Sequence, residues 1–245
     1  MKKTNSKTFE KLKQELLAFS GYKASLASHC CISLGPIDQA FPNHTFPVGA
    51  LHEFLSFSPE ESAATYGFVM AVVAKIAQSG GVVLWISTSR LVFPPALLVF
   101  GIKPDNIIFL DLDKERDCFW AMEEALKCEG LSAIVCESTG PIDFIISRRF
   151  QLAIEKSGVT GFLLRHQTRQ PSAIATLTRW KISPLQSALP DGIPGLGAPR
   201  WKVELHKVQN GKPGVWHIEF LKKEFKEITI PSHVNRQPVQ QRKAG

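Results

Sequence analysis

The stretch EFLSFSPEESAATYGFVMAVVAKIAQSGGVVLWIS, residues Glu53–Ser87, carries the clearest structural signal in this 245-residue sequence. A β-like run is followed by a short polar turn, a long apolar helical pattern and a second β-like run. Nucleotide-binding proteins hold phosphates at such a strand-to-helix turn, with glycines and a Gly-Lys-Ser/Thr sequence. This turn has neither feature, so the sequence predicts the architecture without the phosphate-binding chemistry.

The turn instead contains the signals of a helix that satisfies its own N-terminus. In SPEE, Ser58 is the predicted N-cap, and Glu61 is placed to accept a hydrogen bond from the amide of Ser58. Glu60 and Glu61 also put negative charge at the positive end of the helix dipole, where a triphosphate would be repelled. Ser62 ends this degenerate phosphate-loop position, and the next lysine, Lys75, is near the far end of the helix. We therefore expect no nucleotide cofactor here.

Outward from this stretch, apolar β-like runs alternate with helical patterns. The predicted strands are GALHEFLSF, GGVVLWIS, NIIFLDL, LSAIVCES and TGFLLRHQ, and the predicted helices are PEESAATYGFVMAVVAKIAQ, PPALLVFG, RDCFWAMEEALKCE and ISRRFQLAIEKSG. Several of the strands are continuously apolar, which is typical of parallel strands covered on both faces. The sequence therefore predicts an α/β fold with a mostly parallel sheet flanked by helices.

The pattern changes after residue 172, where strands follow one another without helices. AIATLTRWKI reads as a strand, and PRWKVELHKVQNGKPGVWHIEF reads as an antiparallel β-hairpin around NGKPG. We divide the chain into an N-terminal helix and linker (1–45), the core (46–182), a loop and β-hairpin extension (183–228) and a basic tail (229–245). The tail has little to bury, and we expect it to be disordered until bound.

Composition limits the possible environments of the chain. The longest apolar run, LVFPPALLVFGI, is too short for a membrane span and contains two prolines, and the N-terminus is not a signal peptide. The five cysteines form no C-x-x-C pair. We expect a soluble, reduced, cytoplasmic protein without a metal site.

The net charge of +7 is distributed unevenly. Residues 148–245 contain 17 Lys and Arg against 6 Asp and Glu, whereas residues 1–147 contain 12 against 16. A basic second half favours an acidic partner, either nucleic acid or an acidic protein surface. An ordinary solvated basic surface is the alternative interpretation.

Seven fragments in order resemble one family, ImuA. They are FPVGALHEF, GFVMAVVAKIAQSGGVVLWIS, LLVFGIKPDNIIFLD, WAMEEAL, ISRRFQLAIEKSGVTGFLLR, TRWKI and PRWKVELHKVQNGKPGVWHIEF, which together span Phe46–Phe220. The resemblance implies a RecA-like core and a non-catalytic accessory role in error-prone translesion synthesis, within the SOS response to DNA damage. The implied partners are an ImuB-like Y-family polymerase homologue, a replicative-type C-family DNA polymerase and RecA.

The likeness to RecA itself implies where catalytic groups would stand. The position of the activating acid falls near Ser89, which is not acidic, while Glu137 stands where the Mg²⁺-linked acid would be. The DNA-binding loop is reduced to TRQPSAIA, so we do not expect DNA binding in the RecA manner, and direct DNA contact through another surface stays open. Two alternatives remain: a divergent RecA-like ATPase or recombinase paralogue that uses Arg148 or Arg165 between subunits, and a SulA-like inhibitor of cell division.

Seven basic residues are the candidates for partner binding: Arg148, Arg149, Arg179, Arg200, Arg236, Arg242 and Lys243. Arg148 and Arg149 are consecutive on a predicted helix, so at most one should face the core. Arg179 and Arg200 precede tryptophans on strands and should point away from them across the sheet. On the helix of WAMEEAL, Trp120 is predicted to lie on the core face and Glu123 and Glu124 on the solvent side.

Overall fold

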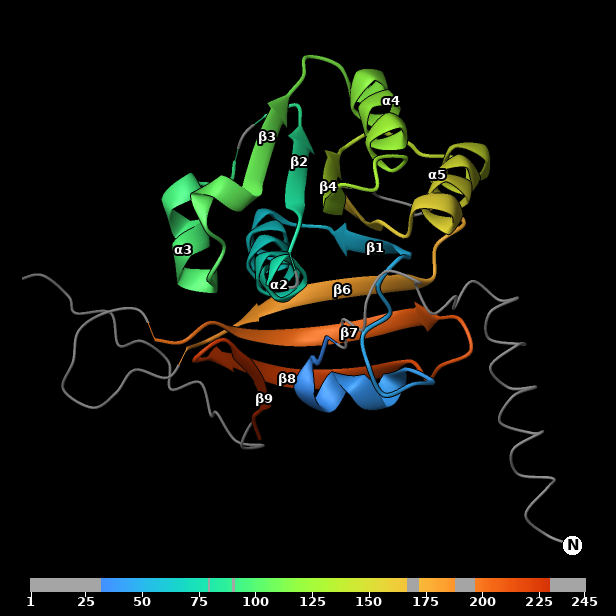
Figure 1. Ribbon diagram of the computed structural model, residues 1–245. Helices are drawn as coiled ribbons and strands as arrows, with labels where there is room; N and C mark the ends of the chain where they lie inside the picture. The colour runs from blue at the N-terminus through green and yellow to red at the C-terminus, as the bar shows by residue number, and fades with distance from the viewer. Residues whose placement is uncertain (1–31, 79, 90, 167–171, 188–196, 230–245) are drawn as a thin grey trace, which may run out of the picture.

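The computed structural model describes residues 32–78, 80–89, 91–166, 172–187 and 197–229 (Figure 1). The N-terminal helix predicted for residues 7–19 and the tail residues from 230 onward lie outside the described residues. None of the helices within these ranges combines the length and apolarity needed to cross a membrane.

The elements follow the predicted alternation. The strands are β1 (Leu51–Ser56), β2 (Val82–Ser87), β3 (Ile107–Asp111), β4 (Leu131–Ser138), β5 (Thr160–His166), β6 (Thr178–Leu185), β7 (Arg200–Val208), β8 (Gly214–Leu221) and β9 (Glu224–Glu227). The α-helices are α2 (Pro59–Ala77), α3 (Leu97–Phe100), α4 (Glu115–Ala125) and α5 (Phe144–Ser157). Short 3-10 turns occur at η1 (Gly35–Ala40), η2 (Pro94–Ala96) and η3 (Pro104–Asn106).

The strands pair in one sheet with the order β3-β2-β4-β5-β1-β6-β7-β8-β9. All pairs among β1 to β6 are parallel. The pairs β6–β7, β7–β8 and β8–β9 are antiparallel. The α/β fold class is therefore confirmed, and the predicted hairpin is β7–β8. The short strand β9 was not predicted, because EFKEI offers only a brief alternating pattern.

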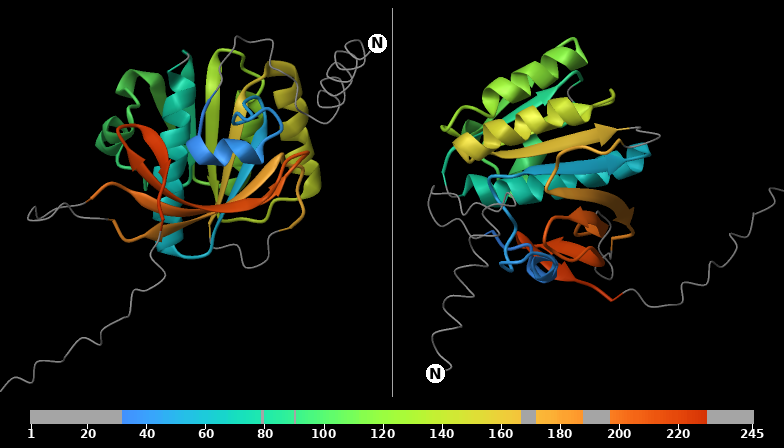
Figure 2. Two further views of the ribbon diagram at one scale, coloured as in Figure 1. Left: turned by 90° about the horizontal axis from the view of Figure 1, so that it is seen from below. Right: turned by 90° about the vertical axis from the view of Figure 1, so that its right-hand side faces the viewer.

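Helices cover the parallel sheet on both faces. Figure 1 and Figure 2 show α2 and α3 on one face and α4 and α5 on the other. Each face has its own apolar cluster: Phe68, Trp85 and Trp180 belong to the α2 side, and Met122 and Phe150 to the α4–α5 side. The sheet thus separates two buried environments.

Helix α2 is the central helix of the fold. It is apolar on most of its circumference, and Phe68, Val69 and Val72 are completely buried. This burial requires cover on more than one side, which the curved strands β6–β9 supply opposite the parallel sheet (Figure 2). A Cβ atom on Gly67 would lie 3.1 Å from the ring of Trp201, so glycine lets the helix approach this strand closely.

Residues 32–46 also contribute to the core on the α2 side. The apolar side chains of this segment are buried, among them Ile37, Phe41 and Phe46. The turn η1 packs against β9, and Gly35, at φ +64°, would place a Cβ atom 2.4 Å from the carbonyl oxygen of Phe225. A glycine is therefore needed where this segment meets the last strand.

Two local expectations differ from the structure. PPALLVFG was expected to be a helix, but its prolines give the turn η2, and only four residues of α-helix follow before Gly101 ends α3 in the left-handed conformation. Trp120 was expected in the core, yet it is 66% exposed, because Cys118 and Met122 occupy the core-facing side of α4. Glu123, expected in solvent, is largely covered.

Candidate functional site

The turn between β1 and α2 is closed by its own side chains. The hydroxyl of Ser58 accepts a hydrogen bond from the Glu61 amide at 3.3 Å, as the predicted N-cap does. The Glu61 carboxylate accepts from the Phe57 amide at 2.8 Å, one residue before the Ser58 amide that was predicted. The helix start therefore satisfies these amides internally.

Charges at this turn are also paired inside the chain. Glu61 forms an ion pair with Lys181 of β6 at 3.1 Å, with side chains that are 15% and 26% exposed. A hydrogen bond from Ser58 lowers the pKa of Glu60, so this carboxylate stays ionised beside the helix terminus. An incoming phosphate would meet two carboxylates, and the neighbouring lysine is already engaged.

A buried polar network lies next to the turn, on the α2 side of the carboxyl end of the sheet. Glu137 ends β4 and accepts hydrogen bonds from the Trp85 ring nitrogen on one oxygen and from the Tyr66 hydroxyl, at 2.8 Å, on the other. Burial raises the pKa of Glu137 and also that of Tyr66. Both carboxylate oxygens are thus committed to neutral donors.

His166 extends this network to the start of α2. Its Nε2 lies 3.1 Å from the Tyr66 hydroxyl and its Nδ1 lies 3.0 Å from the Ser62 hydroxyl. Burial lowers the pKa of His166 to about 4, so the imidazole is neutral at pH 7. Ser62, predicted as part of the phosphate-loop position, is thereby tied to the last residue of β5.

A second carboxylate, that of Glu115, accepts hydrogen bonds from the loop that follows β4. Glu115, the first residue of α4, accepts hydrogen bonds from the Ser138 hydroxyl at 2.7 Å, from the Thr139 amide and hydroxyl at 2.7 Å each, and from the Gly140 amide at 3.2 Å. These bonds lower its pKa against the opposing effect of burial. The amides of Thr139 and Gly140 could bind an anion, but here they donate to the carboxylate of Glu115.

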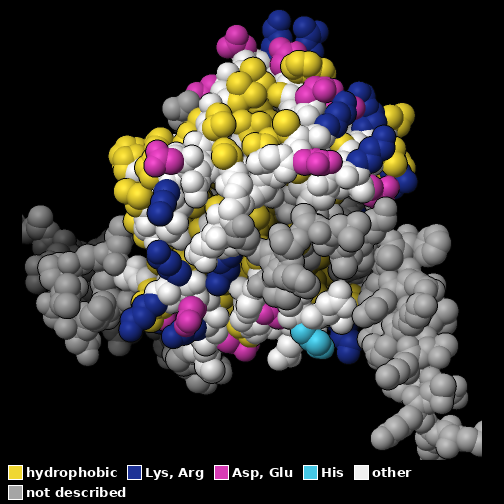
Figure 3. Space-filling view, viewed as in Figure 1, with side chains coloured by type: hydrophobic (Ala, Val, Ile, Leu, Met, Phe, Trp, Pro, Cys, Tyr) yellow, Lys and Arg dark blue, Asp and Glu magenta, His cyan; other side chains and the backbone are white. Residues whose placement is uncertain are grey.

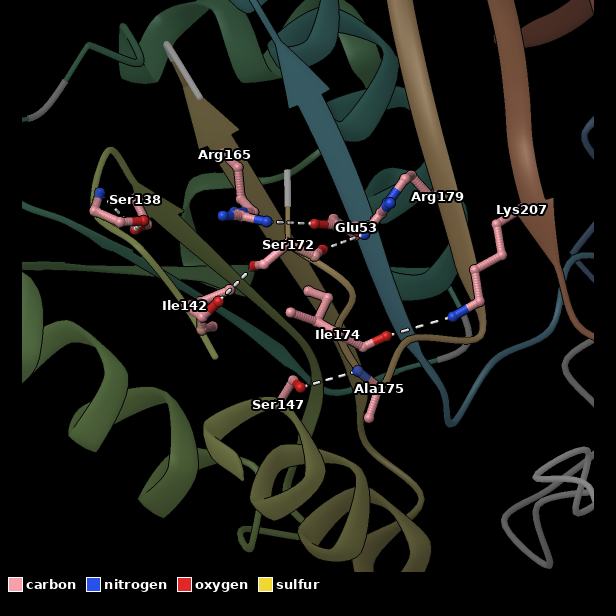
Figure 4. Close-up of polar contacts among 11 residues, drawn as sticks. Glu53, Ser138, Ile142, Ser147, Arg165, Ser172, Ile174, Ala175, Arg179 and Lys207 are labelled. Carbon is pink, nitrogen blue, oxygen red and sulfur yellow. Dashed lines mark hydrogen bonds and ion pairs between the residues drawn. The ribbon is translucent and has the colours of Figure 1, made fainter. Parts of the chain in front are cut away.

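On the opposite face of the sheet, Glu53 anchors a cluster of cations. Figure 4 shows Arg165 of β5 and Arg179 of β6 approaching it from two sides, at 2.8 and 2.6 Å. Glu53 and Arg165 are buried, and Arg179 also donates to the Ser172 carbonyl oxygen at 2.7 Å. Sequence reasoning missed Glu53, although a lone glutamate in the apolar run ALHEFL was a signal of a paired internal charge.

The charge of this cluster is unbalanced among the described residues. Lys207 of β7 lies opposite Arg179, and its pKa is lowered by burial and by Arg179. Three cations thus gather around one carboxylate, and Nε of Arg165 has no hydrogen-bond partner among the residues that the structure describes. Arg179, a predicted partner-binding residue, is instead held mainly by internal contacts.

The other predicted partner-binding residues are dispersed. Arg148 and Arg149 are both exposed on α5, where Arg149 pairs with Glu123 of α4 at 2.6 Å. Arg200 pairs with Glu219 of β8 at 2.7 Å. The tail residues Arg236, Arg242 and Lys243 lie outside the described residues. Among the residues that the structure describes, the predicted basic side chains therefore do not lie together in one site.

These observations define a three-layer α/β protein in which the turn after the first strand and the neighbouring carboxylates are satisfied within the chain. The chain belongs to the ImuA family. It is 33% identical over 195 residues to Protein ImuA of Caulobacter vibrioides strain NA1000 / CB15N, and the match covers 75% of this chain and 80% of that protein. The same values hold for Protein ImuA of strain ATCC 19089 / CIP 103742 / CB 15. No family model matches the chain.

Proposed function

We propose that this protein is a non-catalytic accessory factor of DNA-damage-induced mutagenesis. It acts by recruitment, bringing an ImuB-like Y-family polymerase homologue and a replicative-type C-family polymerase together for error-prone translesion synthesis. Its membership of the ImuA family supports the biological setting. The observation that carries the non-catalytic part is the self-occupied turn at Ser58–Glu61.

Nucleotide binding at this turn would require several internal bonds to break. The hydrogen bond from the Phe57 amide to Glu61 and the ion pair of Glu61 with Lys181 would both be lost. A hydrogen bond to a charged group contributes about 1.5–3 kcal/mol and a partly exposed ion pair up to about 1 kcal/mol, so their combined loss would weaken binding by about tenfold to a thousandfold. Repulsion between the phosphates and Glu60 would add to this cost.

The position of Glu137 also supports a structural role. An acid that positions Mg²⁺ needs ionised oxygens that are free to coordinate water or metal. Both oxygens of Glu137 already accept hydrogen bonds from ring and hydroxyl donors, and burial raises its pKa, which works against the ionised form. The residue therefore stabilises the packing between α2, β2 and β4.

The ATPase alternative would require an arginine that reaches a neighbouring subunit. Arg165 is 2% exposed and bound to Glu53, so it is unsuited to act across an interface. Arg148 is exposed, but it lies on α5, on the sheet face opposite α2.

Two calorimetric titrations test the proposal. The purified protein is titrated with ATP and Mg²⁺ and then with the purified polymerase homologue of the same organism. We expect no heat of ATP binding and saturable binding of the polymerase homologue. ATP binding that is abolished by Glu137→Gln would contradict the non-catalytic assignment, and absence of polymerase binding would contradict the recruitment role.

A matched variant makes the first titration sharper. Glu60→Lys/Glu61→Lys removes both carboxylates from the turn and supplies cations in their place. If the carboxylates exclude the triphosphate, this variant gains weak nucleotide binding that the wild-type protein lacks. Glu123→Lys/Glu124→Lys on α4 changes the net charge equally, away from the turn, and should gain none.

A further inference from the structure

A cluster of exposed apolar side chains lies at η2 and α3. Four of the twelve large apolar side chains that are exposed in the described ranges fall within nine residues: Leu91 (67%), Phe93 (68%), Leu98 (58%) and Val99 (69%). Figure 3 shows this concentration as the yellow side chains over α3 at the left of the molecule. Exposed apolar residues are ordinary when scattered, but a contiguous group marks an interaction surface.

The segment that carries these side chains is held firmly in place. Its alternate residues are buried, with Leu97 and Ile102 each 1% exposed, and Phe100 stacks on Phe220 of β8 at 5.8 Å. Gly101, at φ +93°, ends α3 and turns the chain back into the core. The exposed side chains therefore cannot be buried by a small local shift, because the inward positions are already filled.

Lysines border the apolar cluster. A methyl group added to Gly101 would lie 3.0 Å from Cε and Nζ of Lys223, so this lysine crosses the end of α3. Lys222 and Lys103 are also exposed, and Leu221 of the same β8–β9 turn is 41% exposed. In Figure 3, dark blue Lys and Arg side chains lie below the yellow cluster on the same side of the molecule. Lysines therefore line part of the border, and Figure 3 also shows an acidic side chain beside the cluster.

The two lysines of the β8–β9 turn occupy strained backbone positions. Lys222 and Lys223 have φ angles of +51° and +63° in the two-residue connection between Leu221 and Glu224. A hairpin turn with positive φ at both central residues favours Asn-Gly, which adopts this conformation with less strain. Two lysines at these positions place charge beside the apolar cluster at the expense of stability, which indicates a functional use.

We propose that this surface binds an amphipathic, acidic segment of a partner protein, whose apolar stripe covers the cluster and whose carboxylates meet the lysines. We call it the α3–hairpin surface: Leu91, Phe93, Leu98, Val99, Lys103, Leu221, Lys222 and Lys223. The inference rests on the proposed recruitment function and assigns the segment to the polymerase homologue. Apolar anchors with a charged rim are the usual arrangement of a protein-binding groove or face.

Charge and side-chain type favour this occupant over two others. A second copy bound through the same surface would bring the lysines of both copies together, which repulsion disfavours. Nucleic acid would use the lysines and the Phe93 ring, but the other apolar side chains, Leu91, Leu98 and Val99, provide neither hydrogen bonds nor ring stacking for bases. An acidic amphipathic segment uses both parts of the surface.

Titration of the full-length protein with the polymerase homologue tests the assignment. Phe93→Asp/Leu98→Asp places charge in the centre of the surface, and we expect the affinity to fall by about tenfold or more, as at interface anchors. Ile145→Asp on α5 is the matched control, because Ile145 is equally exposed at 69%, and it should leave the affinity within about twofold. Unchanged melting temperatures verify that both variants are folded.

A turn variant separates binding from stability. Lys222→Asn/Lys223→Gly removes both charges and supplies residues suited to positive φ. We expect the melting temperature to rise while the affinity falls by about threefold to tenfold at low salt, with a smaller fall at high salt. A merely structural role of the turn would raise the melting temperature without changing the affinity.

The outcomes distinguish failure of this inference from failure of the proposed function. If the wild-type protein does not bind the polymerase homologue, both are overturned. If it binds and the surface variants bind equally well, only the α3–hairpin assignment is overturned. Two further results would also overturn it, provided that Phe93→Asp/Leu98→Asp still binds the polymerase homologue. The first is that the wild-type protein binds mixed phosphatidylcholine and phosphatidylglycerol vesicles and only this variant loses that binding. The second is that the wild-type protein self-associates and this variant does not.

Discussion

At the turn between β1 and α2, the polar groups of Ser58 and Glu61 are bound within the chain, whereas the α3–hairpin surface leaves Phe93 and Leu98 facing solvent. A phosphate-binding turn works in the opposite way, because it keeps backbone amides available for a ligand. The apolar cluster likewise departs from a typical surface, where large apolar residues are scattered. Under the proposed recruitment function, the partner binds at the α3–hairpin surface, and the turn at the end of the sheet serves only to stabilise the fold.

The largest effect is expected from removing the buried carboxylate of Glu53, which is bound entirely within the chain. Glu53→Gln leaves Arg165, which is 2% exposed, without its anion, and the loss of one partner of a buried ion pair typically destabilises a protein by about 3–5 kcal/mol. Urea unfolding measures the change. Glu124→Gln is the control, because Glu124 pairs with Lys127 in solvent at 2.6 Å and its replacement should change the free energy of unfolding by less than about 0.5 kcal/mol. A small effect at Glu53 would mean that the arginines find other anions.

A second test concerns the pH dependence of the network on the α2 side. The pKa of His166 is lowered to about 4, so below pH 6.5 the unfolded chain binds this proton more tightly than the folded one. Stability is therefore lost as the pH falls from 6.5 towards 4, by about 2 kcal/mol at pH 5 for this residue.

The variant His166→Gln isolates this contribution. It should lose about 2 kcal/mol less than the wild-type protein between pH 7 and pH 5, as measured by urea unfolding at both values. His52 has a pKa lowered by burial to about 3 and also destabilises the fold in acid, but it is present in both proteins and cancels in the comparison. Equal losses in the two proteins would show that His166 takes up its proton in the folded state.

A variant of the β8–β9 turn tests the α3–hairpin surface through the free energy of unfolding alone. Lys222→Asn/Lys223→Gly should raise the free energy of unfolding by about 1 kcal/mol, because it relieves two left-handed positions. Lys103→Asn removes one charge from the same border without touching the turn, and its effect should stay within about 0.5 kcal/mol. A decrease for the turn variant would show that the lysine side chains stabilise the fold through contacts such as that of Lys223 with Gly101.

The sequence predicted what depends on local patterns. Apolar runs gave the parallel strands, and SPEE gave the N-cap at Ser58. It missed contacts that depend on register between distant segments, such as Glu53 opposite Arg179, 126 residues apart. The prediction that Trp120 lies in the core was wrong for a related reason. Its size suggested burial, but Cys118 and Met122 occupy the core-facing side of α4, so Trp120 points outwards. The α3–hairpin surface likewise joins segments that the sequence separates.

The smallest effect is expected for a substitution on α5, which can be compared directly with the α3–hairpin surface. Arg149 on α5 pairs with Glu123 at 2.6 Å, and its side chain is 57% exposed, so Arg149→Ala should change the free energy of unfolding by less than about 1 kcal/mol. If α5 lies outside the partner interface, polymerase binding should stay within about twofold, against the tenfold loss expected for Phe93→Asp/Leu98→Asp. Titration of both variants with the polymerase homologue at one salt concentration shows which of the two surfaces binds it. A larger loss for Arg149→Ala would transfer the docking site from the α3–hairpin surface to the α4–α5 face of the sheet.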